Sequence, residues 1–155
     1  MAQAPDLKRL RRHVTIYTVV QVFFVALLIF MAFNFQATFS AKGMSHVFLN
    51  SIIATIIFQL AIFYPLKKAA AREVENEIAS LVPGLSAEQH KALRRKRLFS
   101  DFIKTSIFVF FFTFILRAPP ATFVLSTTFF TFVVTSLTYL QCFNFAAKRH
   151  LQGKS

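Results

Sequence analysis

The residues of this chain that could take part in chemistry are few, and most lie at the edges of its apolar segments. Its four histidines are His13, His46, His90 and His150. A membrane haem needs two imidazoles that face each other inside a helix bundle, but three of these residues lie at or beyond the predicted cytoplasmic face and His46 lies at the outer one. We therefore expect no haem. The single cysteine, Cys142, rules out an internal disulfide and a metal site built from several cysteines.

Sequence patterns that mark common catalytic sites are absent. The chain contains no H-E-x-x-H, C-x-x-C, G-x-x-x-x-G-K-[ST] or G-x-S-x-G pattern. It has only three glycines, too few for a loop that wraps phosphate groups with its backbone. We predict that the protein is not an enzyme and that it has no catalytic, cofactor-binding or metal-binding residues and no cofactor.

A row of small polar side chains recurs with helical spacing in the last apolar segment. Its members are Thr128, Thr131, Thr135, Thr138 and Cys142, separated by three, four, three and four positions. Small residues at this spacing let two membrane helices approach closely, and their hydroxyls can bond to a backbone carbonyl or to another helix. We expect a packing face. The alternative is a hydrophilic path for a solute.

Two glutamines lie at similar depth in the first two apolar segments. Gln21 and Gln59 are each about eight residues from the nearest predicted cytoplasmic boundary. An unpartnered carboxamide in hydrocarbon costs on the order of several kcal/mol. We expect the two side chains to bond to each other, with coordination of an ion or solute as the alternative. No carboxylate lies deep in any apolar segment, which argues against a proton-coupled transporter.

Asp101 and Lys104 lie one helical turn apart at the start of the third apolar segment. An opposite-charge pair at this position can neutralise itself among lipid headgroups and fix the depth of the helix. Lys104 can also extend its aliphatic stem along the lipid towards water. The pair is therefore predicted to anchor the third helix.

The segment around this pair also resembles a known family. Residues 99–104, Phe-Ser-Asp-Phe-Ile-Lys, resemble the acidic-x-x-Lys pattern that members of the ATP synthase protein I family carry at the head of their third span, with Ser100 and Asp101 where the family has Gly and Glu. Those proteins are small, basic and four-span. The resemblance implies a role in assembling the membrane ring of the rotary ATP synthase, or in supplying cations to it.

The elements that position these residues are four apolar segments. The chain has 155 residues, of which 55% are hydrophobic and 22 are Phe. A membrane span needs roughly 20 mainly apolar residues. We predict spans at about 13–35, 47–65, 100–117 and 121–146. The fold class is all-α: a four-transmembrane-helix bundle that forms a single integral membrane domain over residues 1–155.

The distribution of charge predicts the orientation of these spans. The net charge is +12, and Lys and Arg cluster in residues 8–12, 67–72, 91–97 and 148–154. Only Lys42 and Arg117 fall in the other two loops. Positive residues are retained on the cytoplasmic side, so both termini are expected in the cytoplasm. The same residues favour a bilayer with anionic headgroups, and we expect no nucleic-acid partner.

The longest segment between spans covers residues 66–99. Its first part is rich in helix formers, Pro83-Gly84 is a helix breaker, and Ser86 with Gln89 forms a capping-box pattern. We predict a cytoplasmic helical hairpin that brings residues 73–77 near the basic region around Arg94. As the largest element in water, it is the expected surface for a partner. The outer connection at 117–120, with two prolines, is predicted to be very tight.

These features favour a non-catalytic role in the inner (plasma) membrane. The chain is expected to be an accessory, assembly or small subunit of a larger inner-membrane complex, one related to the ATP synthase if the resemblance holds. The alternative is a self-assembling channel or transporter module for an ion or small solute. The partner is expected to be another membrane protein or further copies of this chain.

Overall fold

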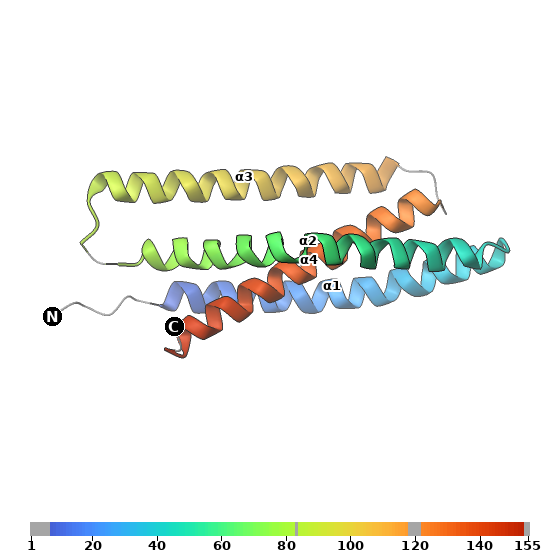
Figure 1. The fold of residues 1–155 in the computed structure, drawn as a ribbon, viewed down its shortest axis with the longest axis horizontal. Helices are drawn as coiled ribbons and strands as arrows, with labels where there is room; N and C mark the ends of the chain where they lie inside the picture. The colour runs from blue at the N-terminus through green and yellow to red at the C-terminus, as the bar shows by residue number, and fades with distance from the viewer. Residues whose placement is uncertain (1–6, 83, 118–121, 154–155) are drawn as a thin grey trace.

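The computed structural model describes residues 7–82, 84–117 and 122–153. These residues form four helices: α1 (Lys8–Ala41), α2 (Ser45–Ala79), α3 (Ala87–Arg117) and α4 (Phe123–Leu151). Each helix is long and apolar enough to cross a membrane. The predicted all-α class with four such helices is confirmed (Figure 1).

Helices α1 and α2 are joined by a tight turn. Gly43 has φ 68°, a left-handed conformation that a residue without a Cβ adopts easily. Its N–H donates to the Ser40 carbonyl at 3.0 Å, which satisfies one of the last carbonyls of α1. The turn therefore reverses the chain, so that α2 runs back beside α1.

The core has two parts, and the first lies at the charged end of the bundle. Its buried residues come from α1, α2 and α4: Leu10, Ala70, Val74, Phe143 and Ala147. Ala70 and Ala147 are small enough for the helix backbones to approach closely. The end of α2 is thus part of the bundle, and the structure does not support a separate hairpin over residues 66–99.

The second part of the core is made of phenylalanines. Phe35 of α1 lies 5.8 Å from the ring of Phe129 and 5.6 Å from that of Phe130, both on α4, with tilted ring planes. Such tilted pairs place the positive edge of one ring towards the negative face of another. Phe39 and Val133 complete this cluster.

Helix α3 packs most loosely. It has no buried residue among those described and lies on one side of the other three helices (Figure 1). Its aromatic contact with α4 is Phe132, whose ring centroid is 5.4 Å from that of Phe108 and 5.2 Å from that of Phe111.

The start of α3 matches the predicted capping box. The Ser86 N–H donates to Gln89 Oε1 at 2.9 Å, and the Gln89 N–H donates to Ser86 Oγ at 3.2 Å. These bonds satisfy N–H groups that have no partner inside the helix. The predicted break at Pro83 and the tight turn at 118–120 lie outside the described residues.

Candidate functional site: an ion-pair cluster beside a cavity

Glu73 of α2 is the meeting point of three helices. Its carboxylate accepts a hydrogen bond from Lys104 Nζ of α3 and another from the Tyr139 hydroxyl of α4. The Lys104 amine also lies over the Tyr139 ring, 5.3 Å from its centroid, at a distance where a cation is attracted to the ring face. The three side chains therefore form one polar unit that connects α2, α3 and α4.

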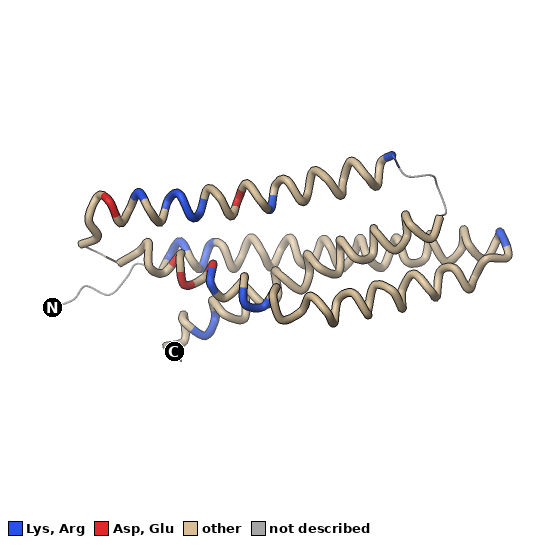
Figure 2. Tube along the Cα trace, turned by 45° about the horizontal axis from the view of Figure 1, so that its top comes forward, with Lys and Arg blue, Asp and Glu red and all other residues tan. Residues whose placement is uncertain are grey.

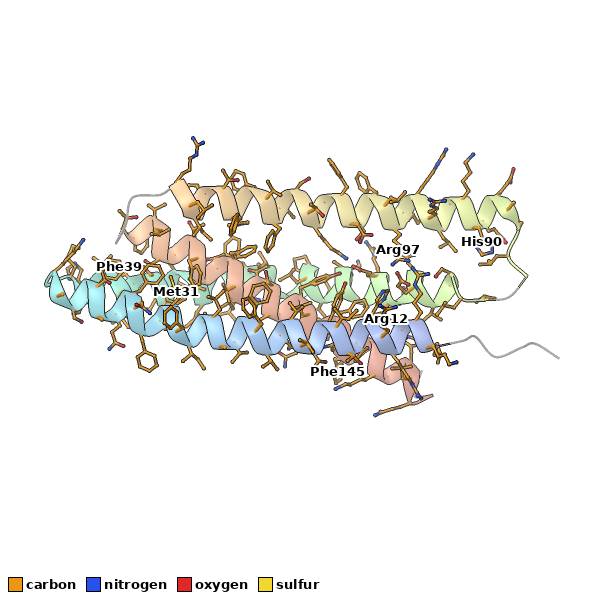
Figure 3. The ribbon with its side chains drawn as sticks, turned by 180° about the vertical axis from the view of Figure 1, so that it is seen from behind. Arg12, Met31, Phe39, His90, Arg97 and Phe145 are labelled. Atoms are coloured by element: carbon orange, nitrogen blue, oxygen red, sulfur yellow. The ribbon has the colours of Figure 1, made fainter. Side chains whose placement is uncertain are left out.

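Glu77 forms a second centre one turn further along α2. It is buried, and its two oxygens lie 3.6 Å from Arg9 Nε of α1 and 3.3 Å from Arg97 Nε of α3. A buried carboxylate is tolerated only when cations or donors compensate its charge. Arg97 comes from the side of α3 that faces the other helices (Figure 3). Together, Glu73 and Glu77 connect α2 to all three other helices.

The predicted pair of Asp101 and Lys104 is present, but it is the longer of the two ion pairs made by Lys104. Lys104 Nζ is 3.9 Å from Asp101 and lies closer to Glu73. Asp101 is also 3.9 Å from Arg97 Nε. The Lys104 side chain thus connects α3 to α2, in addition to its contact within α3.

Sequence reasoning missed Glu73 and Tyr139 as site residues, although one signal could have pointed to this face. Glu77 continues the four-and-three spacing of Ala70 and Val74, so it shares their buried face of α2. An acidic residue in an apolar face is a sign of a buried partner. No comparable signal marks Tyr139.

The threonine row of α4 faces α2. Ser51 and Ser126 hydroxyls lie 2.6 Å apart, and Thr55 and Thr131 hydroxyls 3.4 Å apart. Further along, Gln59 Nε2 donates to Thr138 at 2.7 Å and Gln59 Oε1 accepts from Thr135 at 3.2 Å.

These hydroxyls and the Gln59 carboxamide form a line of hydrogen bonds across the contact between α2 and α4. Thr128 makes no side-chain hydrogen bond within the described part of the chain. Cys142 is partly buried against the cluster that contains Leu10.

The expected hydrogen bond between Gln21 and Gln59 is not formed, and both glutamines bond to α4 instead. Asn144 Nδ2 donates to Gln21 Oε1 at 3.1 Å and lies 3.3 Å from Thr18 Oγ1. The depth of the two glutamines was inferred from the sequence, but the rotation of α1 and α2 directs both carboxamides towards α4. Asn144 was not anticipated.

A cavity of about 1620 Å³ opens beside the ion-pair cluster, between α3 and the other helices. Its lining includes Glu73, Glu77 and Lys104 at one end and phenylalanines such as Phe108 and Phe132 at the other. Within the described ranges, no group of three or more His, Cys, Asp or Glu residues is arranged to hold a metal ion. The charged side chains of the cluster can make electrostatic contacts, and the phenylalanines can make apolar ones.

The described residues thus form an all-α protein whose four helices are long and apolar enough to cross a membrane. Comparison with protein-family models, with curated proteins and with solved structures found no match to this chain.

Proposed function

We propose that this chain is a multi-pass inner-membrane protein with both termini in the cytoplasm, acting as a non-catalytic accessory, assembly or small subunit of a larger complex. Most of its Lys and Arg residues gather at the end of the bundle where α1 begins and α4 ends (Figure 2). Lys42 follows the end of α1 and Arg117 lies in the last turn of α3, at the other end. This arrangement supports the orientation because basic residues are retained on the cytoplasmic side.

The loose packing of α3 is the observation that carries the accessory role. Although α3 has 31 residues, none is buried among those described. Its large apolar side chains are open to the surroundings, for example Phe102 at 69% and Phe110 at 66%. A helix held mainly by two ion pairs, one cation–π contact and two aromatic ring pairs leaves most of its surface for another membrane helix. The proposed partner surface is the outer face of α3, in place of a cytoplasmic hairpin.

The alternative, a channel or transporter module, draws its support from the cavity beside Glu73. The threonine row offers less support for it. Thr131, Thr135 and Thr138 bond to side chains of α2, so their hydroxyls are engaged in helix packing. A link to the ATP synthase rests on the resemblance at residues 99–104 alone and stays a proposal.

Site-specific photocrosslinking in membranes of the native host tests the partner surface. A photoreactive amino acid at Phe110 of α3 is compared with one at Phe23 of α1, which is 64% exposed. Both positions lie about ten residues into their predicted spans, so lipid surrounds them similarly. We expect Phe110 to give one discrete protein adduct, identified by mass spectrometry as a component that also co-purifies with the chain. Identical adducts at both positions, or none at either, would contradict the proposal.

A further inference from the structure

The polar part of the cavity carries an excess of positive charge. Its carboxylates are Glu73, Glu77 and Asp101, and these are compensated by Arg9, Arg97 and Lys104.

Four more cations line the same cavity and make no ion pair with a described carboxylate: Arg72, Lys91, Arg94 and Lys96. The lining therefore has four more cations than carboxylates. The sequence analysis expected the basic region around Arg94 to lie near residues 73–77. Within that region Arg97 makes the ion pair with Glu77, and Lys104, further along α3, makes the one with Glu73.

The other part of the cavity is mainly apolar, although Thr131, Thr135 and Ser136 of α4 also line it. On α3 it is lined by Ile107, Phe108 and Phe111, and on the facing helices by Phe58 and Phe132. From Lys104 to Phe111 the helix rises by roughly 10 Å, at about 1.5 Å per residue. One leaflet of a bilayer has a hydrocarbon thickness of about 15 Å, half of the full core. The apolar part thus has the length of a large portion of an acyl chain.

We propose that this cavity binds a phospholipid with an anionic headgroup. The phosphate lies in the polar part, on the face of α3 that Arg94 and Lys96 flank from its two sides. An acyl chain runs along α3 to Phe108, which lies roughly 18 Å from Lys96 at about 1.5 Å per residue. Arginine and phosphate form strong charge-assisted hydrogen bonds, and basic pockets between membrane helices are a known mode of anionic lipid recognition. A free phosphate ion leaves the phenylalanines uncovered, and a zwitterionic lipid brings no net negative charge for the four cations.

Native mass spectrometry of the purified full chain tests this proposal. The protein is exchanged into detergent that contains either phosphatidylglycerol or phosphatidylcholine, and bound lipid is counted. We expect phosphatidylglycerol to be retained in preference to phosphatidylcholine. The double variant Arg94→Gln, Lys96→Gln should lower its retention about tenfold or more, as expected for the loss of two cations close to the phosphate.

The matched control removes the same two residue types from the end of α4. Lys148 and Arg149 are exposed, lie at the same charged end and do not line the cavity. The variant Lys148→Gln, Arg149→Gln should retain phosphatidylglycerol at the level of the parent protein. If this control loses as much lipid as the cavity variant, the attraction is general surface electrostatics and the proposal is wrong.

A second pair of variants tests the apolar part. Ile107→Trp places a large ring in the cavity and should displace the lipid, whereas Val109→Trp, on a residue of similar exposure outside the lining, should not. Equal retention in both tryptophan variants would overturn the proposal. So would displacement of the lipid by inorganic phosphate, because that result assigns the site to the ion. The site is separate from the outer face of α3, so either proposal can fail alone.

Discussion

Glu77 provides a test of how the bundle is held together at its charged end. The Glu77 side chain is only 9% exposed, while those of its partners Arg9 and Arg97 are 45% and 39% exposed. Removing the carboxylate leaves two arginines that water can hydrate. Removing both arginines leaves a buried carboxylate with no cation within ion-pair distance in the described structure. Both perturbations break the two ion pairs of Glu77, and the loss of Arg97 also removes its longer contact with Asp101. Their costs in stability should still differ widely.

We expect Glu77→Gln to lower the free energy of unfolding by about 0–1 kcal/mol, the range for partly exposed ion pairs. The double variant Arg9→Gln, Arg97→Gln should lower it by about 3 kcal/mol, near the lower end of the 3–5 kcal/mol range for uncompensated buried charges, because Glu77 retains some access to water. The triple variant that combines all three changes should recover most of this loss, since no buried charge remains.

Equilibrium unfolding in mixed detergent micelles, followed by circular dichroism, measures these differences. Recovery in the triple variant is the critical result. If the triple variant is as unstable as the arginine double variant, the loss comes from the packing of the arginine side chains and not from the stranded charge. That result would rule out the uncompensated charge of Glu77 as the cause, even if both arginines prove important for stability.

Two further predictions concern packing and topology. Thr131→Leu should overpack the contact between α2 and α4 and lower the free energy of unfolding by about 1–3 kcal/mol, whereas Thr131→Ala should lower it by less than about 1 kcal/mol. Unfolding in detergent measures both values. If the alanine variant is less stable than the leucine variant, the hydroxyl matters more than side-chain volume. In a Cys142→Ser background, an impermeant thiol reagent applied to intact cells should label Ser45→Cys but not Gly84→Cys, and labelling at position 84 would contradict the proposed orientation.

Much of the architecture could be predicted because the information for it is local. Four long apolar runs are sufficient to predict four long helices, since an uncharged stretch of this length leaves its backbone no other way to satisfy its hydrogen bonds in a bilayer. The cap formed by Ser86 and Gln89 depends on residues three positions apart, and it was predicted correctly.

The candidate site was harder to predict because it depends on how the helices are rotated about their axes. The position of a residue along an apolar segment predicts its depth in the membrane, which is why Gln21 and Gln59 were predicted to lie at similar depths. The direction in which each side chain points depends on packing among all four helices. For that reason the contacts of Gln21 with Asn144 and of Lys104 with Glu73 could not be read from the sequence.

The hydrogen bonds between α2 and α4 also bear on the order in which the helices are synthesised and assembled. They join residues 75 to 79 positions apart. While the ribosome is still making α3, the Ser51, Thr55 and Gln59 side chains of α2 are without the partners that α4 later supplies. Until α4 is present, serine and threonine hydroxyls can donate to a backbone carbonyl one turn earlier in the same helix. Ser51 donates in this way to Val47, and Thr55 donates to Ser51. Gln59 has no such bond within α2 in the described structure. Of these three residues, it therefore depends most on α4 for the hydrogen bonds of its side chain.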